Sequence, residues 1–254
     1  MGLACLAMAK YVGFGGTPDR AAAGSLMSEM KDERDIGNLL VSHRLLAHVL
    51  ATVPLPLSPP VEAPEPLTAE ERVVALAVAQ AGVVFSDPTL YGEAEDLEAM
   101  LPKPILFIAL ARGGRINRVR QMLDEEAAQG GPAAGEPPLV HASILGRYSA
   151  LEGALARQEQ SRVGGGGGFA QFRDVARLLL ASSPVPHLPH KCDLGHLGLT
   201  ALPPSARLPG PNGSLLLTGN KIREVRRHPV STLYGHAAAH ALLPAASKRA
   251  SRSA

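Results

Sequence analysis

Aromatic residues are scarce in this chain of 254 residues: it has no tryptophan, and phenylalanine, tyrosine and tryptophan together make up 4% of it. Because aromatic side chains line most small-molecule pockets, this scarcity argues against a large ring-filled ligand cavity. The two cysteines, Cys5 and Cys192, lie far apart and do not form a disulfide framework. No segment reaches the roughly 18 consecutive apolar residues of a membrane span. These absences predict a cytoplasmic protein without a transmembrane segment.

The formal net charge is only +2, but the charges are unevenly distributed. From position 207 onward, a single acid, Glu224, faces eight basic residues. They are Arg207, Lys221, Arg223, Arg226, Arg227, Lys248, Arg249 and Arg252. We interpret residues 229–254 as a solvated, disordered basic tail rather than a nucleic-acid contact.

Two segments near the C-terminal end share the same spacing of apolar residues at an offset of 23 positions. The matched residues are Cys192, Leu194, Leu199 and Leu202, and then Leu215, Leu217, Ile222 and Val225. Asn220 stands at the turn of the second segment, where its amide can satisfy backbone groups, whereas Leu197 holds that place in the first. The pattern resembles leucine-rich repeats, which implies short strands stacked in a solenoid over residues 187–228. A leucine-rich hairpin is the simpler alternative.

The first half of the sequence predicts helices separated by a linker. Residues 1–53 form an N-terminal helical segment, with an amphipathic helix over 31–53. Residues 54–67 are proline-rich and are interpreted as a spacer. Thr68 and Glu71 then form a capping box that predicts a helix over 69–81, with Gly82 as its stop.

Residues 105–123 and 138–155 share an apolar helix, a glycine-containing turn and a second apolar helix, at a period near 33 residues. The stretch Pro-Leu-Val-His-Ala that begins at Pro138 resembles the opening of an ankyrin repeat, with Val140 in place of the usual histidine. A further fragment at 174–180 resembles the end of such a unit. We therefore predict helical repeats over 68–183, with a glycine-rich insertion at 161–168; armadillo-like packing is an open alternative.

The predicted fold is mostly α-helical, with stacked helical hairpins leading into a short α/β leucine-rich solenoid. This order of modules resembles the N-terminal region of Roco-type leucine-rich-repeat kinases. The P-loop motif and the kinase motifs His-Arg-Asp and Asp-Phe-Gly are missing from the sequence, so the resemblance implies a scaffold role without GTPase or kinase activity. A third leucine-rich unit is expected near residue 238 but is not found, which predicts a truncated product of a longer protein.

No catalytic motif and no cofactor-binding motif is found in the sequence. We predict a non-catalytic protein-interaction scaffold that needs no cofactor, and whose oligomeric state the sequence leaves open. The positions predicted to face outward on the leucine-rich strands are Asp193, Gly195, His196, Leu216 and Thr218. Of these, Asp193, His196, Leu216 and Thr218 are the candidate partner-binding residues. The alternative is a metal-dependent regulator or enzyme. It would use the cluster of His187, His190, Cys192 and His196.

Overall fold

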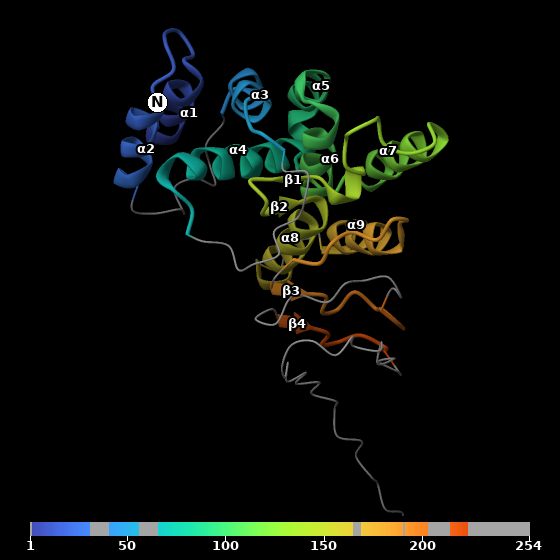
Figure 1. The fold of residues 1–254 in the computed structure, drawn as a ribbon. Helices are drawn as coiled ribbons and strands as arrows, with labels where there is room; N and C mark the ends of the chain where they lie inside the picture. Colours follow the sequence, from blue (N-terminus) through green and yellow to red (C-terminus); the bar gives the residue numbers. More distant parts are fainter. Residues whose placement is uncertain are drawn as a thin grey trace, which may run out of the picture.

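The chain folds into a layer of helices followed by two short parallel strands, in the order of the sequence (Figure 1). The computed structural model describes residues 2–30, 41–55, 66–164, 169–189, 191–202 and 214–222. The predicted tail at 229–254 and most of the predicted spacer at 54–67 lie outside these residues. The described part is mostly helical, and its few strands form no closed sheet.

Three helices form the N-terminal part: α1 (Leu3–Val12), α2 (Arg20–Glu29) and α3 (His43–Ala51). Asp19 caps α2, because its carboxylate accepts a hydrogen bond from the amide of Ala22 at 2.9 Å. The amphipathic helix predicted over 31–53 is shorter, since α3 begins at residue 43 and residues 31–40 lie outside the described chain.

Helix α4 (Ala69–Ser86) is the central element of the helical layer. The predicted capping box is confirmed: the Thr68 side chain accepts from the amide of Glu71, and the Glu71 carboxylate accepts from the amide of Thr68. The predicted stop at Gly82 is wrong, because the helix continues to Ser86. Gly82 is instead the place where the aliphatic part of Arg112 packs against α4.

A turn at Pro88–Leu90 leads into α5 (Tyr91–Met100), and two helices then form a hairpin, α6 (Lys103–Arg112) and α7 (Ile116–Ala128). The predicted helix, glycine turn and helix over 105–123 are confirmed, with Gly113 and Gly114 at the turn.

The helix predicted to begin at Pro138 is not formed. A 3-10 turn (Leu139–His141) and a small antiparallel hairpin, β1 (Ser143–Ile144) with β2 (Tyr148–Ser149), occupy this stretch. Leu145 and Gly146 both have positive φ values, which end any helix and reverse the chain. Helix α8 (Ala150–Gly164) follows, so the first four residues of the insertion predicted at 161–168 are helical.

Helix α9 (Phe169–Ala181) packs against α8 as the second helical hairpin. The first helices of the two hairpins begin at residues 103 and 150, 47 positions apart, and the second helices at 116 and 169, 53 positions apart. The predicted period near 33 residues is therefore not the spacing of the helix pairs.

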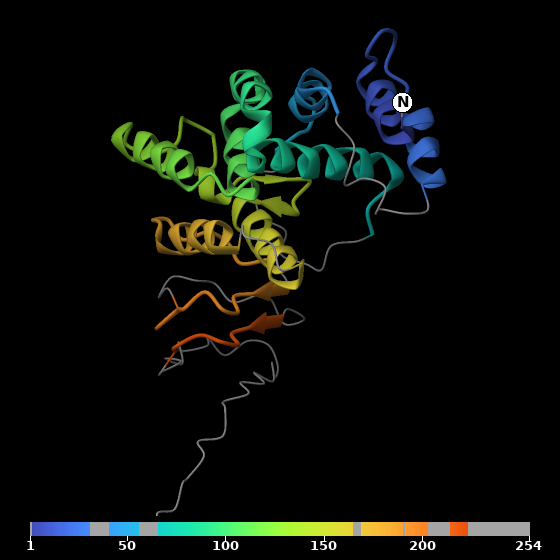
Figure 2. The same ribbon diagram turned by 180° about the vertical axis from the view of Figure 1, so that it is seen from behind.

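Strands β3 (Lys191–Asp193) and β4 (Ser214–Leu216) pair in parallel below α8 and α9 (Figures 1 and 2). Lys191 pairs with Ser214, Cys192 with Leu215 and Asp193 with Leu216. Each residue thus lies 23 positions before its partner, which equals the offset between the two sequence units. A simple hairpin would be antiparallel, so the pairing excludes that alternative.

One hydrophobic core runs from α1 to the first strand unit. It includes Leu46 of α3, Phe85 of α4, Phe107 of α6 and Leu179 of α9, and it ends at Leu194 and Leu197 after β3. Within the described residues, no helix is both long and apolar enough to cross a membrane.

The contact between Gly82 and Arg112 gives a first testable prediction. Changing an exposed or loosely packed helical glycine to alanine normally stabilises the folded protein by about 1 kcal/mol. At Gly82 the added Cβ would lie 2.7 Å from Cγ of Arg112, so Gly82→Ala should instead lower the free energy of unfolding by about 1–3 kcal/mol. Urea denaturation measures both this variant and the control Gly92→Ala, whose Cβ would meet nothing within 4 Å. Equal stabilisation of both variants would contradict the packing.

Candidate functional site

The outward face of the two parallel strands brings the four predicted partner-binding residues together. Asp193 and Leu216 are paired neighbours, and the amide of His196 donates to the carbonyl of Thr218 at 2.8 Å. All four side chains are exposed, and Leu216 is 54% exposed. Along β4 and the two residues that follow, exposed and half-buried residues alternate, as expected for a sheet that covers the core with one side only.

The backbone behind this face is held by Asn220. Its Oδ1 accepts a hydrogen bond from the amide of Leu199 at 3.0 Å. Its Nδ2 donates to the carbonyls of Leu194 at 2.7 Å and of Leu217 at 3.1 Å. One side chain therefore joins both units and fixes the spacing of the turns that follow the strands.

The helical layer closes the other edge of the first unit. Gln158 of α8 is 5% exposed, and its Nε2 donates to the carbonyl of Gly195 at 3.0 Å. Sequence reasoning missed this residue. The available signal was that Gln158 continues the apolar stripe of Leu151 and Leu155 along α8, where a polar side chain needs a partner.

Charged residues near the end of α8 interact electrostatically with residues of the strand face. Arg162 and Glu159 form an ion pair at 2.6 Å, and its hydrogen bond lowers the pKa of Glu159 and raises that of Arg162. His196 adds to the lowering of the Glu159 pKa, and Asp193 adds to the raising of the Arg162 pKa. The face thus combines one exposed leucine with charged and polar groups of both signs.

The alternative histidine and cysteine cluster is not assembled in the described residues. Cys192 is 2% exposed in the core, and burial raises the pKa of its thiol to about 12, so it stays protonated. His196 is exposed on the strand face, while the ring of His187 lies 4.4 Å from that of His141. His190 lies outside the described residues. Where side chains are described, no three histidine, cysteine or acidic groups lie close enough to share a metal ion.

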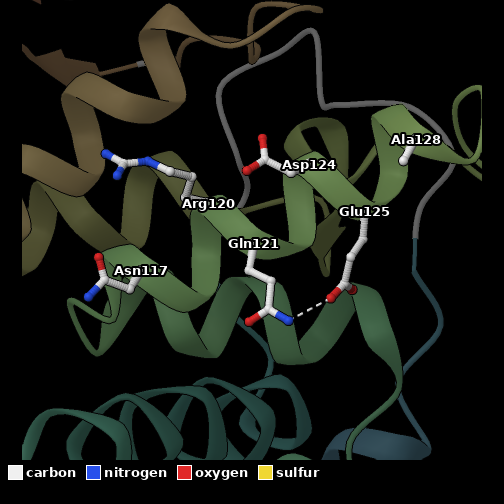
Figure 3. Close-up of a pocket in the computed structure, with 6 residues that line it drawn as sticks. All are labelled: Asn117, Arg120, Gln121, Asp124, Glu125 and Ala128. Carbon is white, nitrogen blue, oxygen red and sulfur yellow. Dashed lines mark hydrogen bonds between the residues drawn. The ribbon is translucent and has the colours of Figure 1, made fainter.

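A depression of about 480 Å³ lies on the exposed side of α7 (Figure 3). Its lining includes Arg120 and Asp124, and the amide of Gln121 donates to the Glu125 carboxylate at 2.8 Å. These residues all come from one helix and point outward, and they include neither a histidine nor a nucleophile with a base beside it. We do not interpret this depression as an active site.

A second group of charges lies where α6, the β1–β2 hairpin and α8 meet. Burial raises the pKa of Glu152 to about 7, although the backbone amide of Ser149, which donates to the Glu152 carboxylate, and the arginines Arg112 and Arg147 act in the opposite direction. Burial and the nearby Arg157 both lower the pKa of Arg112. A carboxylate that is only partly ionised at neutral pH therefore faces several cations.

Removal of the Asn220 side chain should loosen both units. Asn220→Ala leaves the Leu199 amide without its acceptor and two carbonyls without their donor, at a cost of about 2 kcal/mol or more. Hydrogen exchange at the amides of Leu194, His196 and Leu199 should accelerate. The control Asn117→Ala removes an exposed asparagine of α7 and should leave these rates unchanged. Unaltered exchange at Leu199 in Asn220→Ala would contradict the assigned hydrogen bond.

The raised pKa of Glu152 predicts the pH dependence of stability. The carboxyl holds its proton more tightly in the folded chain than in the unfolded chain, so its contribution is greatest below about pH 4.5 and is lost as the pH rises to about 7. Glu152→Gln should therefore gain stability relative to the wild type over this interval, by about 3 kcal/mol in total. Denaturation at a series of pH values measures this difference.

Glu159→Gln is the matched control for that series. In the wild type the pKa of Glu159 is lowered, so its carboxylate stabilises the folded chain above the pKa of the unfolded chain. Glu159→Gln should therefore lose stability relative to the wild type as the pH rises through the acidic range. Equal pH profiles for the Glu152 and Glu159 variants would show that Glu152 titrates as an exposed group.

Comparisons with protein-family models, with curated proteins and with solved structures found no match to this chain. We therefore infer its function from the strand face, from the helical cover and from the charges described above.

Proposed function

We propose that this chain is a non-catalytic protein-interaction scaffold of the leucine-rich-repeat type, and that a partner protein binds the outward face of β3 and β4. The observation that carries the proposal is Leu216, which is 54% exposed on β4, whose backbone is hydrogen-bonded to β3 and to Leu194 after it. A large apolar side chain on a rigid surface is a typical anchor for a partner, because little conformational entropy is lost when it is covered.

The surroundings of Leu216 support the same role. Asp193 lies beside it on β3, and Thr218 follows two residues later on the same face. His196 lies against Gly219, where an added Cβ would collide with the imidazole, so this ring is held in place. An apolar centre with polar groups around it is the usual composition of a protein-binding patch.

In this proposal the helix pairs α6–α7 and α8–α9 are divergent ankyrin-like or armadillo-like units that precede the leucine-rich units. The module order resembles that of the N-terminal region of Roco-type leucine-rich-repeat kinases. The role carried over is partner binding alone, since fold resemblance by itself does not transfer an activity.

Leu216→Asp tests the strand face. The charge should abolish capture of the partner, because an ionised carboxylate cannot be desolvated in an apolar contact. The circular dichroism spectrum should not change, since the side chain is exposed. Proteins retained by the immobilised chain are identified by mass spectrometry and compared between variants.

The matched control is Met100→Asp, which changes another exposed apolar residue, 41% exposed at the end of α5. Proteins that are retained by the wild type and by Met100→Asp but lost with Leu216→Asp would support the face. Retention of the same proteins by Leu216→Asp would refute it.

A further inference from the structure

The side chain of Arg112 crosses a gap left by two glycines. Arg112 ends α6, and its aliphatic carbons lie against Gly82 of α4 and Gly153 of α8. A Cβ on Gly82 would lie 2.7 Å from Cγ of Arg112, and a Cβ on Gly153 would lie 3.1 Å from its Cβ. The three helices thus fix the stem of this arginine, and its direction is set by packing.

At the charged end of Arg112, one donor has no hydrogen-bond partner among the described residues. This donor is Nε, which is buried without a hydrogen-bond partner. Buried charged donors are normally paired, so such a group requires an explanation. The residue as a whole is half-buried.

A second cation stands near it. Arg157 of α8 is close enough to Arg112 to act on its charge, and the Nε of Arg157 is likewise buried without a partner. Other parts of Arg157 are engaged: Nη1 donates to Gln160 at 3.3 Å, and the guanidinium lies 5.2 Å from the centre of the Phe172 ring. Arg157 therefore adds positive charge, and both arginines keep an unpaired Nε–H donor.

The local acid does not compensate these two cations. From α8, Glu152 faces Arg112 at the end of α6. It also lies near Arg147 and Ser149 of the β1–β2 hairpin and near Cys192 of β3. The pKa of Glu152 is raised to about 7 by burial, so near neutral pH a part of the molecules carries no negative charge there. The cluster is left with an excess of positive charge in a partly desolvated place.

We propose that Arg112, with Arg157 beside it, binds an oxyanion, either the carboxylate of an acidic side chain or a phosphate group. A guanidinium presents two parallel N–H donors that match the two oxygens of such a group. The ligand supplies the missing negative charge and the missing acceptors. Glu152 opposes binding when it is ionised and permits it when it is protonated, so binding strengthens as the pH falls.

The test is a titration of the full chain, followed by NMR of the arginine Nε–H groups. Inorganic phosphate is one probe and N-acetylglutamate is the other, each at about pH 6 and about pH 8. The Arg112 signal should shift in a saturable manner with at least one probe. N-acetylglutamate, whose charge is the same at both pH values, should bind more tightly at the lower pH. Saturation by phosphate alone assigns a phosphate-bearing ligand, and saturation by N-acetylglutamate alone assigns an acidic side chain. No saturable shift with either probe overturns the proposal.

Two variants and a control connect the binding to the residues. Arg112→Gln should weaken binding by about tenfold or more, because a charge-assisted pair is lost. Glu152→Gln should tighten binding at the higher pH and remove most of the pH dependence. Arg120→Gln changes an exposed arginine of α7 and should alter neither the affinity for the probes nor its pH dependence. Equal weakening in Arg112→Gln and Arg120→Gln would show only nonspecific attraction, which also overturns the proposal.

The stability of Arg112→Gln is checked by thermal denaturation, and Arg112→Lys provides a second variant that keeps the charge. Lysine cannot offer two parallel donors, so Arg112→Lys should bind more weakly than the wild type even when its unfolding temperature is unchanged. Wild-type affinity in Arg112→Lys would refute the paired-donor geometry.

Discussion

The strand face depends on the cover that the helical layer gives to the first strand. Two short parallel strands cannot bury their apolar side alone, and a parallel pair needs material on its inner face and at its edge. Here Cys192, Leu194 and Leu197 belong to the same core as α4, α6 and α9. The hydrogen bond from Gln158 to Gly195 then satisfies a carbonyl at the edge that faces the helices. The helices thus cover both the apolar side and the edge of β3.

This cover explains why the two units differ at one position. Asn220 bonds to backbone groups of its own unit and of the preceding unit, so an asparagine is useful only where a strand unit precedes it. The equivalent Leu197 has no strand unit before it in the described chain, and it is fully buried. An asparagine at 197 would have carried an unsatisfied amide into the core. The departure from the repeat pattern is therefore a consequence of the change from helices to strands.

Features set by local spacing were predictable from the sequence, and features set by contacts between distant residues were not. The 23-residue offset predicted the register of β3 and β4, and Thr68 with Glu71 predicted the start of α4. The end of α4 could not be predicted, because Gly82 is used for a contact with Arg112, 30 positions away. The stretch after Pro138 was misread as a helix, since nothing in a leucine predicts the positive φ of Leu145. Leu216 and Thr218 followed from strand alternation, while Gln158 depended on how α8 lies over the strands. The prediction that Gly195 faces outward is wrong, because Gly195 is buried and its carbonyl accepts the hydrogen bond from Gln158.

Helix α8 connects the strand face to the arginine cluster. Near its start, Glu152 and Gly153 face Arg112; further along, Gln158 bonds the first strand unit, and Glu159 and Arg162 lie near the strand face. The stem of Arg112 passes between Gly153 and Gly82, so the spacing of α8 from α4 and α6 is set by how closely these backbones approach. A larger residue at either glycine would displace α8 and, with it, the donor that holds Gly195. The geometry of the strand face is therefore fixed by contacts on the opposite side of the same helix.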